Sequence, residues 1–94
     1  MKAVLYQKPM DFAVVDVAKP EIGDYQVLIK VRSCGVCRTD IHIHHGEFIA
    51  GFPLIPGHEF VGEVVEVGKN VDKSLLGQRV AADNTVLCGH CYYC

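Results

Sequence analysis

Residues 57–67 of the chain read GHEFVGEVVEV, and this stretch decides the fold class. From Phe60 to Val67 the run is rich in Val and places two Glu residues among apolar ones, which is the pattern of a half-buried strand. Gly62 in its middle indicates a bulge or a bend. The run ends at Gly68-Lys69-Asn70, a combination of residues typical of a turn. The sequence therefore predicts a strand over residues 60–67.

Four other short runs rich in Val, Leu and Ile have the same character. They cover residues 2–6, 12–17, 26–31 and 78–82, and residues 19–24 carry turn chemistry. The one plausible helix covers residues 37–45. Short strands at this spacing, separated by Gly and Pro, predict a mainly β fold: a small antiparallel barrel or sandwich with a short helix.

Length and composition restrict the class of protein. With 94 residues, half of them hydrophobic, the chain is expected to form one core and to bury about 60 to 65% of its unfolded surface. The net charge is −2 and the nine basic residues are scattered, which argues against a nucleic-acid partner. No apolar run approaches the roughly 18 residues needed to span a membrane. Five cysteines and no secretory h-region favour a cytoplasmic location without a disulfide framework.

The first cluster of chemically active residues is Cys37 with His58-Glu59. Cys34-Gly-Val-Cys37 alone could be a redox pair, half of a zinc site or two buried thiols. A Cys, a His and a carboxylate together suit Zn²⁺. The pair His58-Glu59 is not the H-E-x-x-H motif of metalloproteases, because the fifth position of that motif is Gly62 here. Cys34 itself is expected to be a small buried apolar residue.

Polar residues follow Cys37 directly. Thr39 and His42 lie at positions i and i+3, so a short helix would place them on one face, where they could pass a proton. Asp40 between them is expected to cap the helix or to orient a metal ligand. His44 and His45 are expected to be solvated side chains.

The second cluster is Cys88-Gly-His-Cys91-Tyr-Tyr-Cys94. Three thiolates at this spacing can converge on one ion, but a closed tetrahedral zinc site needs four donors. We therefore expect a structural zinc site that lacks its fourth ligand, in a truncated chain. His90 could be that ligand, although its adjacency to Cys91 makes tetrahedral ligation awkward. Tyr92 and Tyr93 are expected to be packing residues.

These three strings together resemble a known family. Residues 34–42, residues 57–65 and the run from Cys88 to Cys94 are similar to the N-terminal, GroES-like part of the zinc-dependent medium-chain alcohol and polyol dehydrogenases. The resemblance covers essentially the whole chain. Many polyol-type members have Gly at the position of Arg38, whereas residues 82–85 are more similar to arabinitol- and sorbitol-type enzymes.

The resemblance implies an incomplete, partly open antiparallel β-barrel over residues 1–94, with the nicotinamide-binding (Rossmann) domain missing. It also implies the function of the parent protein: oxidation of a primary or secondary alcohol or polyol through a zinc-bound alkoxide, with hydride transfer to NAD or NADP held by the missing domain. The parent would be a homo-oligomer, and this fragment would be inactive alone. The implied site residues are Cys37, His58 and Glu59 on the catalytic zinc, Thr39 and His42 in a proton relay, Arg38 at the cofactor pyrophosphate, and Cys88, Cys91 and Cys94 on a structural zinc.

Two other classes stay open at this point. C-x-x-C-x-x-C also begins a bacterial ferredoxin motif, so an iron–sulfur electron carrier is one alternative, although the motif occurs only once here. The other is an inactive GroES-like binding module or an incomplete gene product. A reading frame that continues with a fourth cysteine and then a G-x-G-x-x-G would favour the dehydrogenase.

Overall fold

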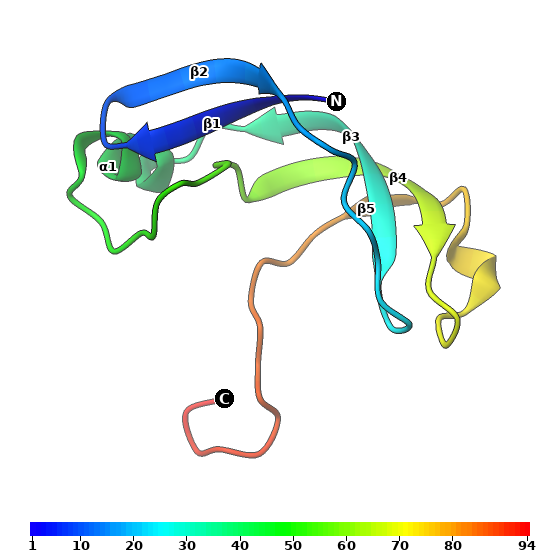
Figure 1. Cartoon of the computed structure of the whole chain (residues 1–94). Helices are drawn as coiled ribbons and strands as arrows, with labels where there is room; N and C mark the ends of the chain where they lie inside the picture. The colour runs from blue at the N-terminus through cyan, green and yellow to red at the C-terminus, as the bar shows by residue number, and fades with distance from the viewer.

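The computed structural model describes residues 1–94 and contains two antiparallel sheets, one α-helix and one 3-10 helix (Figure 1). The first sheet is the hairpin of β1 and β2, and the second has the strand order β3-β4-β5. Helix α1 follows β3, and η1 precedes β5. The bounds are β1 (Lys2–Lys8), β2 (Asp11–Asp16), β3 (Val27–Gly35), α1 (Arg38–His45), β4 (Glu59–Val67), η1 (Lys73–Leu75) and β5 (Arg79–Ala81).

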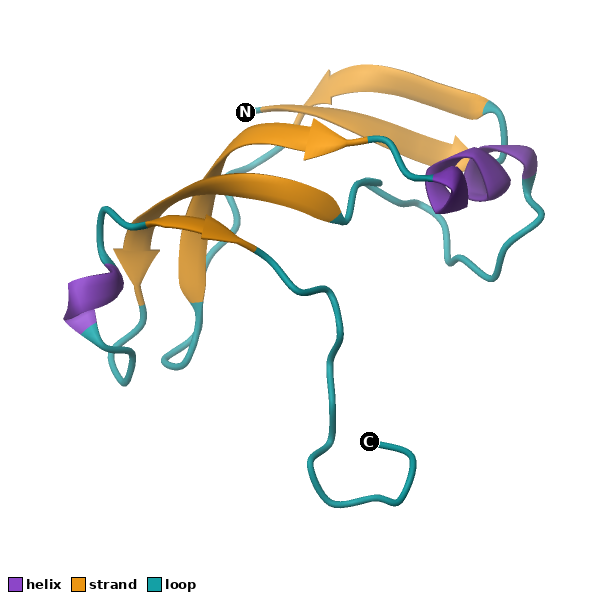
Figure 2. Ribbon diagram, turned by 180° about the vertical axis from the view of Figure 1, so that it is seen from behind, coloured by secondary structure: helices purple, strands orange, loops and turns teal.

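The mainly β fold predicted from the sequence is confirmed. All five expected strands and the expected helix are present, with ends that differ by a few residues. The two sheets do not close into a barrel. In Figures 1 and 2 the hairpin lies near one end of the second sheet, with α1 beside the hairpin turn, and β3 and β4 curve away from it. No helix is long and apolar enough to cross a membrane.

The predicted irregularity at Gly62 coincides with a shift in the register between β3 and β4. Val31 pairs with Gly62 but Ser33 pairs with Val61, so the extra residue of the bulge is on β3. A Cβ atom at Gly62 would lie 2.5 Å from the carbonyl oxygen of Lys30. Only a residue without a side chain fits between the strands at this point.

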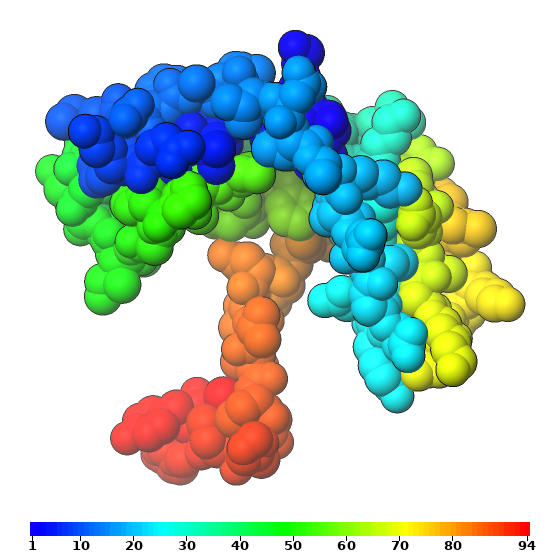
Figure 3. Space-filling model, in the orientation of Figure 1, coloured from blue at the N-terminus to red at the C-terminus, as the bar shows by residue number.

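The expectation of one core is wrong. Only four of the 94 residues are buried, and Ile43 and Val64 are the only two large apolar side chains among them. The physical reason is that the two sheets diverge, while the chain after Ala82, which forms no helix or strand, extends away from both (Figure 3). The strands therefore keep their apolar faces largely uncovered.

We predict that Gly62→Ala destabilises the chain by about 1 to 3 kcal/mol, because the new methyl group would overlap the β3 backbone. Urea denaturation followed by circular dichroism measures the change. The matched control is Gly51→Ala, where a Cβ would meet nothing within 4 Å and the stability should change by less than about 1 kcal/mol. Equal stability of the Gly62 variant and the unmodified chain would contradict the close approach of the strands.

Candidate metal centre

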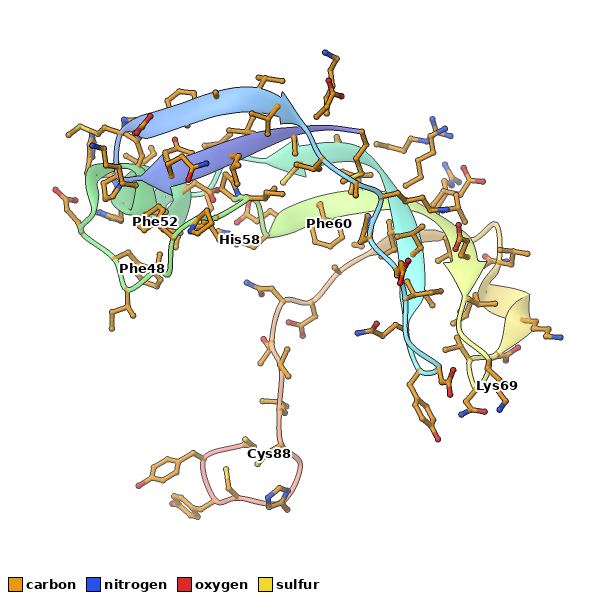
Figure 4. The ribbon with its side chains drawn as sticks, in the orientation of Figure 1. Phe48, Phe52, His58, Phe60, Lys69 and Cys88 are labelled. Atoms are coloured by element: carbon orange, nitrogen blue, oxygen red, sulfur yellow. The ribbon has the colours of Figure 1, made fainter.

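The pairing of β3 with β4 determines where the first cluster forms. The ladder ends with Gly35 opposite Glu59, so the end of β3 and the start of β4 are neighbours. Cys37 lies two residues after Gly35, and His58 immediately precedes Glu59. The ligand atoms of Cys37, His58 and Glu59 all lie within 4.8 Å of one another. Figure 4 shows His58 on the segment that enters β4, near α1.

Asp40 connects helix α1 to this cluster. Its Oδ2 accepts a hydrogen bond of 2.9 Å from the backbone N–H of Cys37, the residue that precedes the helix. Its Oδ1 lies 3.5 Å from Nδ1 of His58 and has no hydrogen-bond partner of its own, although it is buried. The expectation that Asp40 caps the helix is confirmed. The same carboxylate also faces the imidazole of the cluster.

The chemistry of these donors fits zinc. An ionised carboxylate only accepts hydrogen bonds, so His58 would present Nδ1–H to Asp40 and keep Nε2 free for a ligand. A metal-bound His58 would satisfy the buried Oδ1 of Asp40 in this way. One thiolate, one imidazole and one carboxylate are common zinc donors, and three protein donors leave a fourth position open.

The other residues expected in this site lie along α1. Oγ1 of Thr39 is 3.7 Å from Sγ of Cys37, which places this hydroxyl next to the cluster. His42 is partly exposed and its Nδ1 lies 2.9 Å from Oε2 of Glu47, but no hydrogen bond joins it to Thr39. Arg38 is exposed and has no hydrogen bond or ion pair. The structure thus brings Thr39 to the cluster but leaves His42 one helical turn away.

Glu47 is the residue that the sequence analysis missed. Its position five residues after His42 matches neither the helical nor the strand period. Gly46 is the feature of the sequence that could have indicated this contact. A glycine at the end of a helix commonly reverses the chain, so that the residue after it lies next to the last helical turn.

Two expectations about neighbouring residues are wrong. His44 is half-buried rather than solvated, because the Tyr6 hydroxyl lies 2.9 Å from its Nδ1 and the ring of Phe12 packs against its ring. Cys34 is exposed rather than buried. Its side chain lines an open hollow of about 490 Å³ between the β1–β2 hairpin and α1. His45 is exposed, as expected.

The second cluster lies in the terminal loop, where Figure 4 labels Cys88. The Sγ atoms of Cys88 and Cys91 lie 3.3 and 3.2 Å from Sγ of Cys94. His90 is not in this group, since its ring nitrogen Nδ1 lies 2.8 Å from the carbonyl oxygen of Cys88. The three cysteines therefore converge without help from the rest of the chain. Tyr92 and Tyr93 are 97% and 95% exposed, so the expectation that they pack is wrong.

Hydrogen bonds make Cys88 unusually acidic. The backbone N–H of His90 contributes most, followed by the thiols of Cys91 and Cys94, and together they lower the pKa of Cys88 to about 7. The thiolate is the form that binds metal. Near pH 7 this cluster therefore already holds a substantial fraction of negative charge.

Comparison with known proteins places the chain in a family. The sequence profile of the alcohol dehydrogenase GroES-like domain matches residues 23–94. The chain belongs to this family. D-arabinitol dehydrogenase 1 of Uromyces fabae is 49% identical over 94 residues, which are all of this chain and 27% of that protein. This GroES-like chain therefore spans a little over a quarter of the length of that relative.

Two solved structures extend the comparison. The alcohol dehydrogenase RspB of Escherichia coli CFT073, in complex with NADH, has a TM-score of 0.92 and 38% identity, covering 100% of this chain and 27% of that one. A cobalt- and zinc-bound thermostable alcohol dehydrogenase from Pyrobaculum aerophilum has a TM-score of 0.90 and 35% identity, covering 100% of this chain and 30% of that one. The GroES-like chain thus has the fold of one part of these enzymes.

We predict that alkylation of Cys88 in the metal-free chain reaches half of its maximal rate near pH 7, because its pKa is lowered to that value. An ordinary thiol has a pKa of about 8.5 and reaches half-maximal rate at correspondingly higher pH. Peptide mass spectrometry after timed iodoacetamide treatment measures the rate at each pH.

The matched variants are His90→Pro, which removes the backbone N–H that stabilises the thiolate, and His90→Ala, which keeps it. His90→Pro should move the half-maximal rate to higher pH, and His90→Ala should leave it in place. A Cys88 profile like that of an ordinary thiol in the unmodified chain would contradict the assignment.

Proposed function

We propose that residues 1–94 are the N-terminal part of the catalytic domain of a zinc-dependent alcohol or polyol dehydrogenase. The parent polypeptide would oxidise a primary or secondary alcohol and reduce NAD or NADP, which a separate domain would bind. The observation that carries this proposal is the convergence of Cys37, His58 and Glu59 within 4.8 Å. The relatives support it, because they are named as arabinitol and alcohol dehydrogenases, and two of them are described with NADH or with zinc and cobalt.

In this proposal Cys37, His58 and Glu59 hold the catalytic zinc. Bound there, zinc would supply a Lewis acid that lowers the pKa of a hydroxyl group by several units. Asp40 fixes the backbone of Cys37, and its Oδ1 lies 3.5 Å from Nδ1 of His58, where it would accept Nδ1–H from the metal-bound ring and orient it. One carboxylate thus holds two of the three ligands.

The proton of the alcohol needs a route to solvent. Oγ1 of Thr39 lies beside the ligands and can accept that proton while passing on its own. His42, one turn further along α1 and partly exposed, is the proposed final acceptor, and a bridging hydroxyl or water completes the step between them.

Arg38 begins the helix as an exposed cation without a partner, which suits contact with the pyrophosphate of the cofactor.

The cysteine loop has a structural role in this proposal. Cys88, Cys91 and Cys94 would bind a second zinc ion, with a fourth ligand supplied by another part of the parent polypeptide. Structural zinc contributes to folding directly, which suits a segment that has no core of its own. The substrate is a small alcohol or polyol.

The test is the metal content and activity of the parent polypeptide. We expect it to bind zinc and to form reduced nicotinamide from an alcohol panel that includes D-arabinitol and ethanol. Cys37→Ser and His58→Ala should each lose most of the catalytic zinc, because each removes one of only three protein ligands. The activity of each variant should fall by about 10³-fold or more. The control His45→Ala, an exposed histidine of the same helix, should keep both. Full activity of the His58 variant would exclude the proposed site.

A separate prediction concerns the relay. His42→Ala in the parent enzyme should keep zinc and fold but lose rate by about 10²-fold, mainly at low pH, where solvent is a poor proton acceptor. The measurement is kcat across pH, with His45→Ala again as the control. If the pH–rate profile does not change, the proton leaves by another route.

A further inference from the structure

Glu47 is hydrogen-bonded to His42 through the backbone. Helix α1 ends at Gly46, which has a φ of 75° in the left-handed region that favours glycine. The N–H of Gly46 donates to the carbonyl of Ile43 at 3.0 Å, and the N–H of Glu47 donates to the carbonyl of His42 at 2.8 Å. The chain reversal at Gly46 therefore brings Glu47 back beside His42, five positions earlier in the sequence.

The side chain of Glu47 makes a second contact with the same residue. Its Oε2 lies 2.9 Å from Nδ1 of His42. Two independent hydrogen bonds thus join Glu47 and His42, one from the backbone and one from the side chain. The backbone hydrogen bond alone would be enough to cap the end of the helix, so the side-chain contact is an additional feature.

This contact sets the tautomer of the ring. An ionised carboxylate has no proton to donate, so Nδ1 of His42 must carry the hydrogen in the contact. In the neutral ring Nε2 is then the nitrogen with a free lone pair. A histidine that accepts a proton needs this unprotonated Nε2 to point away from the carboxylate that holds Nδ1–H.

The charges near this pair are few. Hydrogen bonding to the His42 ring is the main cause that lowers the pKa of the Glu47 carboxyl below its usual range, and the positive charges of His45 and His42 add to it. Arg38 lies one turn before His42 on α1. The β1–β2 hairpin packs on another side of the helix, where Tyr6 meets His44.

We propose that Glu47 is a positioning residue of the relay, which holds the His42 ring with Nδ1–H toward the loop and Nε2 free to accept the proton. This inference rests on the proposed function for its role in catalysis. The geometry of the pair itself does not depend on zinc, cofactor or substrate. The pair is exposed, at 44% for the His42 side chain and 60% for that of Glu47, so its effect should be modest and sensitive to salt.

The experiment is a nitrogen-15 NMR titration of the histidine rings in the 94-residue chain, with His42→Ala to assign the His42 signals. We expect the neutral His42 ring to be mostly the Nδ1–H tautomer. Glu47→Gln keeps an oxygen that can accept a hydrogen bond from Nδ1–H, so the tautomer should persist in this variant. Glu47→Ala should lose the tautomer preference.

The matched control is Glu21→Gln, which removes an exposed carboxylate that has no histidine partner and should leave the His42 tautomer as it is. In the parent enzyme, Glu47→Ala should lower kcat with little change in KM, and Glu47→Gln should keep most of the kcat, because its oxygen can still accept from Nδ1–H. If the NMR tautomer is the same with and without Glu47, the inference is wrong whether or not the enzyme is active. If NMR shows the expected changes but no alcohol is oxidised, the proposed function fails and the pairing stands.

Discussion

The antiparallel register of β3 and β4 is the constraint on which the site depends. Because the ladder ends with Gly35 opposite Glu59, the segments just outside the ladder leave the sheet together. Cys37 comes from one of them and His58 from the other, although 21 positions separate them in the sequence. A shift of the register by one residue would turn Glu59 to the other face of the sheet. The bulge opposite Gly62 helps to prevent such a shift, because only a glycine of β4 fits against the carbonyl oxygen of Lys30.

The two cysteine-containing clusters are built in different ways. The central one gathers its ligands from the connection between β3 and α1 and from the start of β4, and Asp40 bonds the backbone of Cys37 and faces the His58 ring without any metal present. The terminal one depends only on the two-residue gaps between Cys88, Cys91 and Cys94, in a loop that is almost fully exposed. Under the proposed function, the fold would support metal affinity at the central cluster. At the terminal cluster a bound metal would instead support the fold of the loop.

Local sequence patterns predicted much of this structure. What they missed depends on contacts between residues that are far apart in the sequence or on a reversal of the chain. The Val-rich runs gave the strands, and the three motif strings indicated both clusters, because period and spacing are local properties. The burial of Cys34 and the single core were predicted wrongly, because burial depends on how the two sheets sit against each other. His44 was expected in solvent because its partner, Tyr6, is 38 positions away. The pairing of Glu47 with His42 depends on a chain reversal at Gly46 that no helical or strand period contains.

The central claim is that Cys37, His58 and Glu59 together bind one zinc ion. Zinc X-ray absorption spectroscopy on the chain in which Cys88, Cys91 and Cys94 are all replaced by serine tests it directly, since that variant keeps only the central cluster. The account predicts one bound zinc with a single sulfur at about 2.3 Å and nitrogen or oxygen ligands at about 2.0 to 2.2 Å, and loss of the sulfur when Cys37 is also changed to serine. Absence of bound zinc, or a ligand shell that the Cys37 change leaves as it was, would contradict the account.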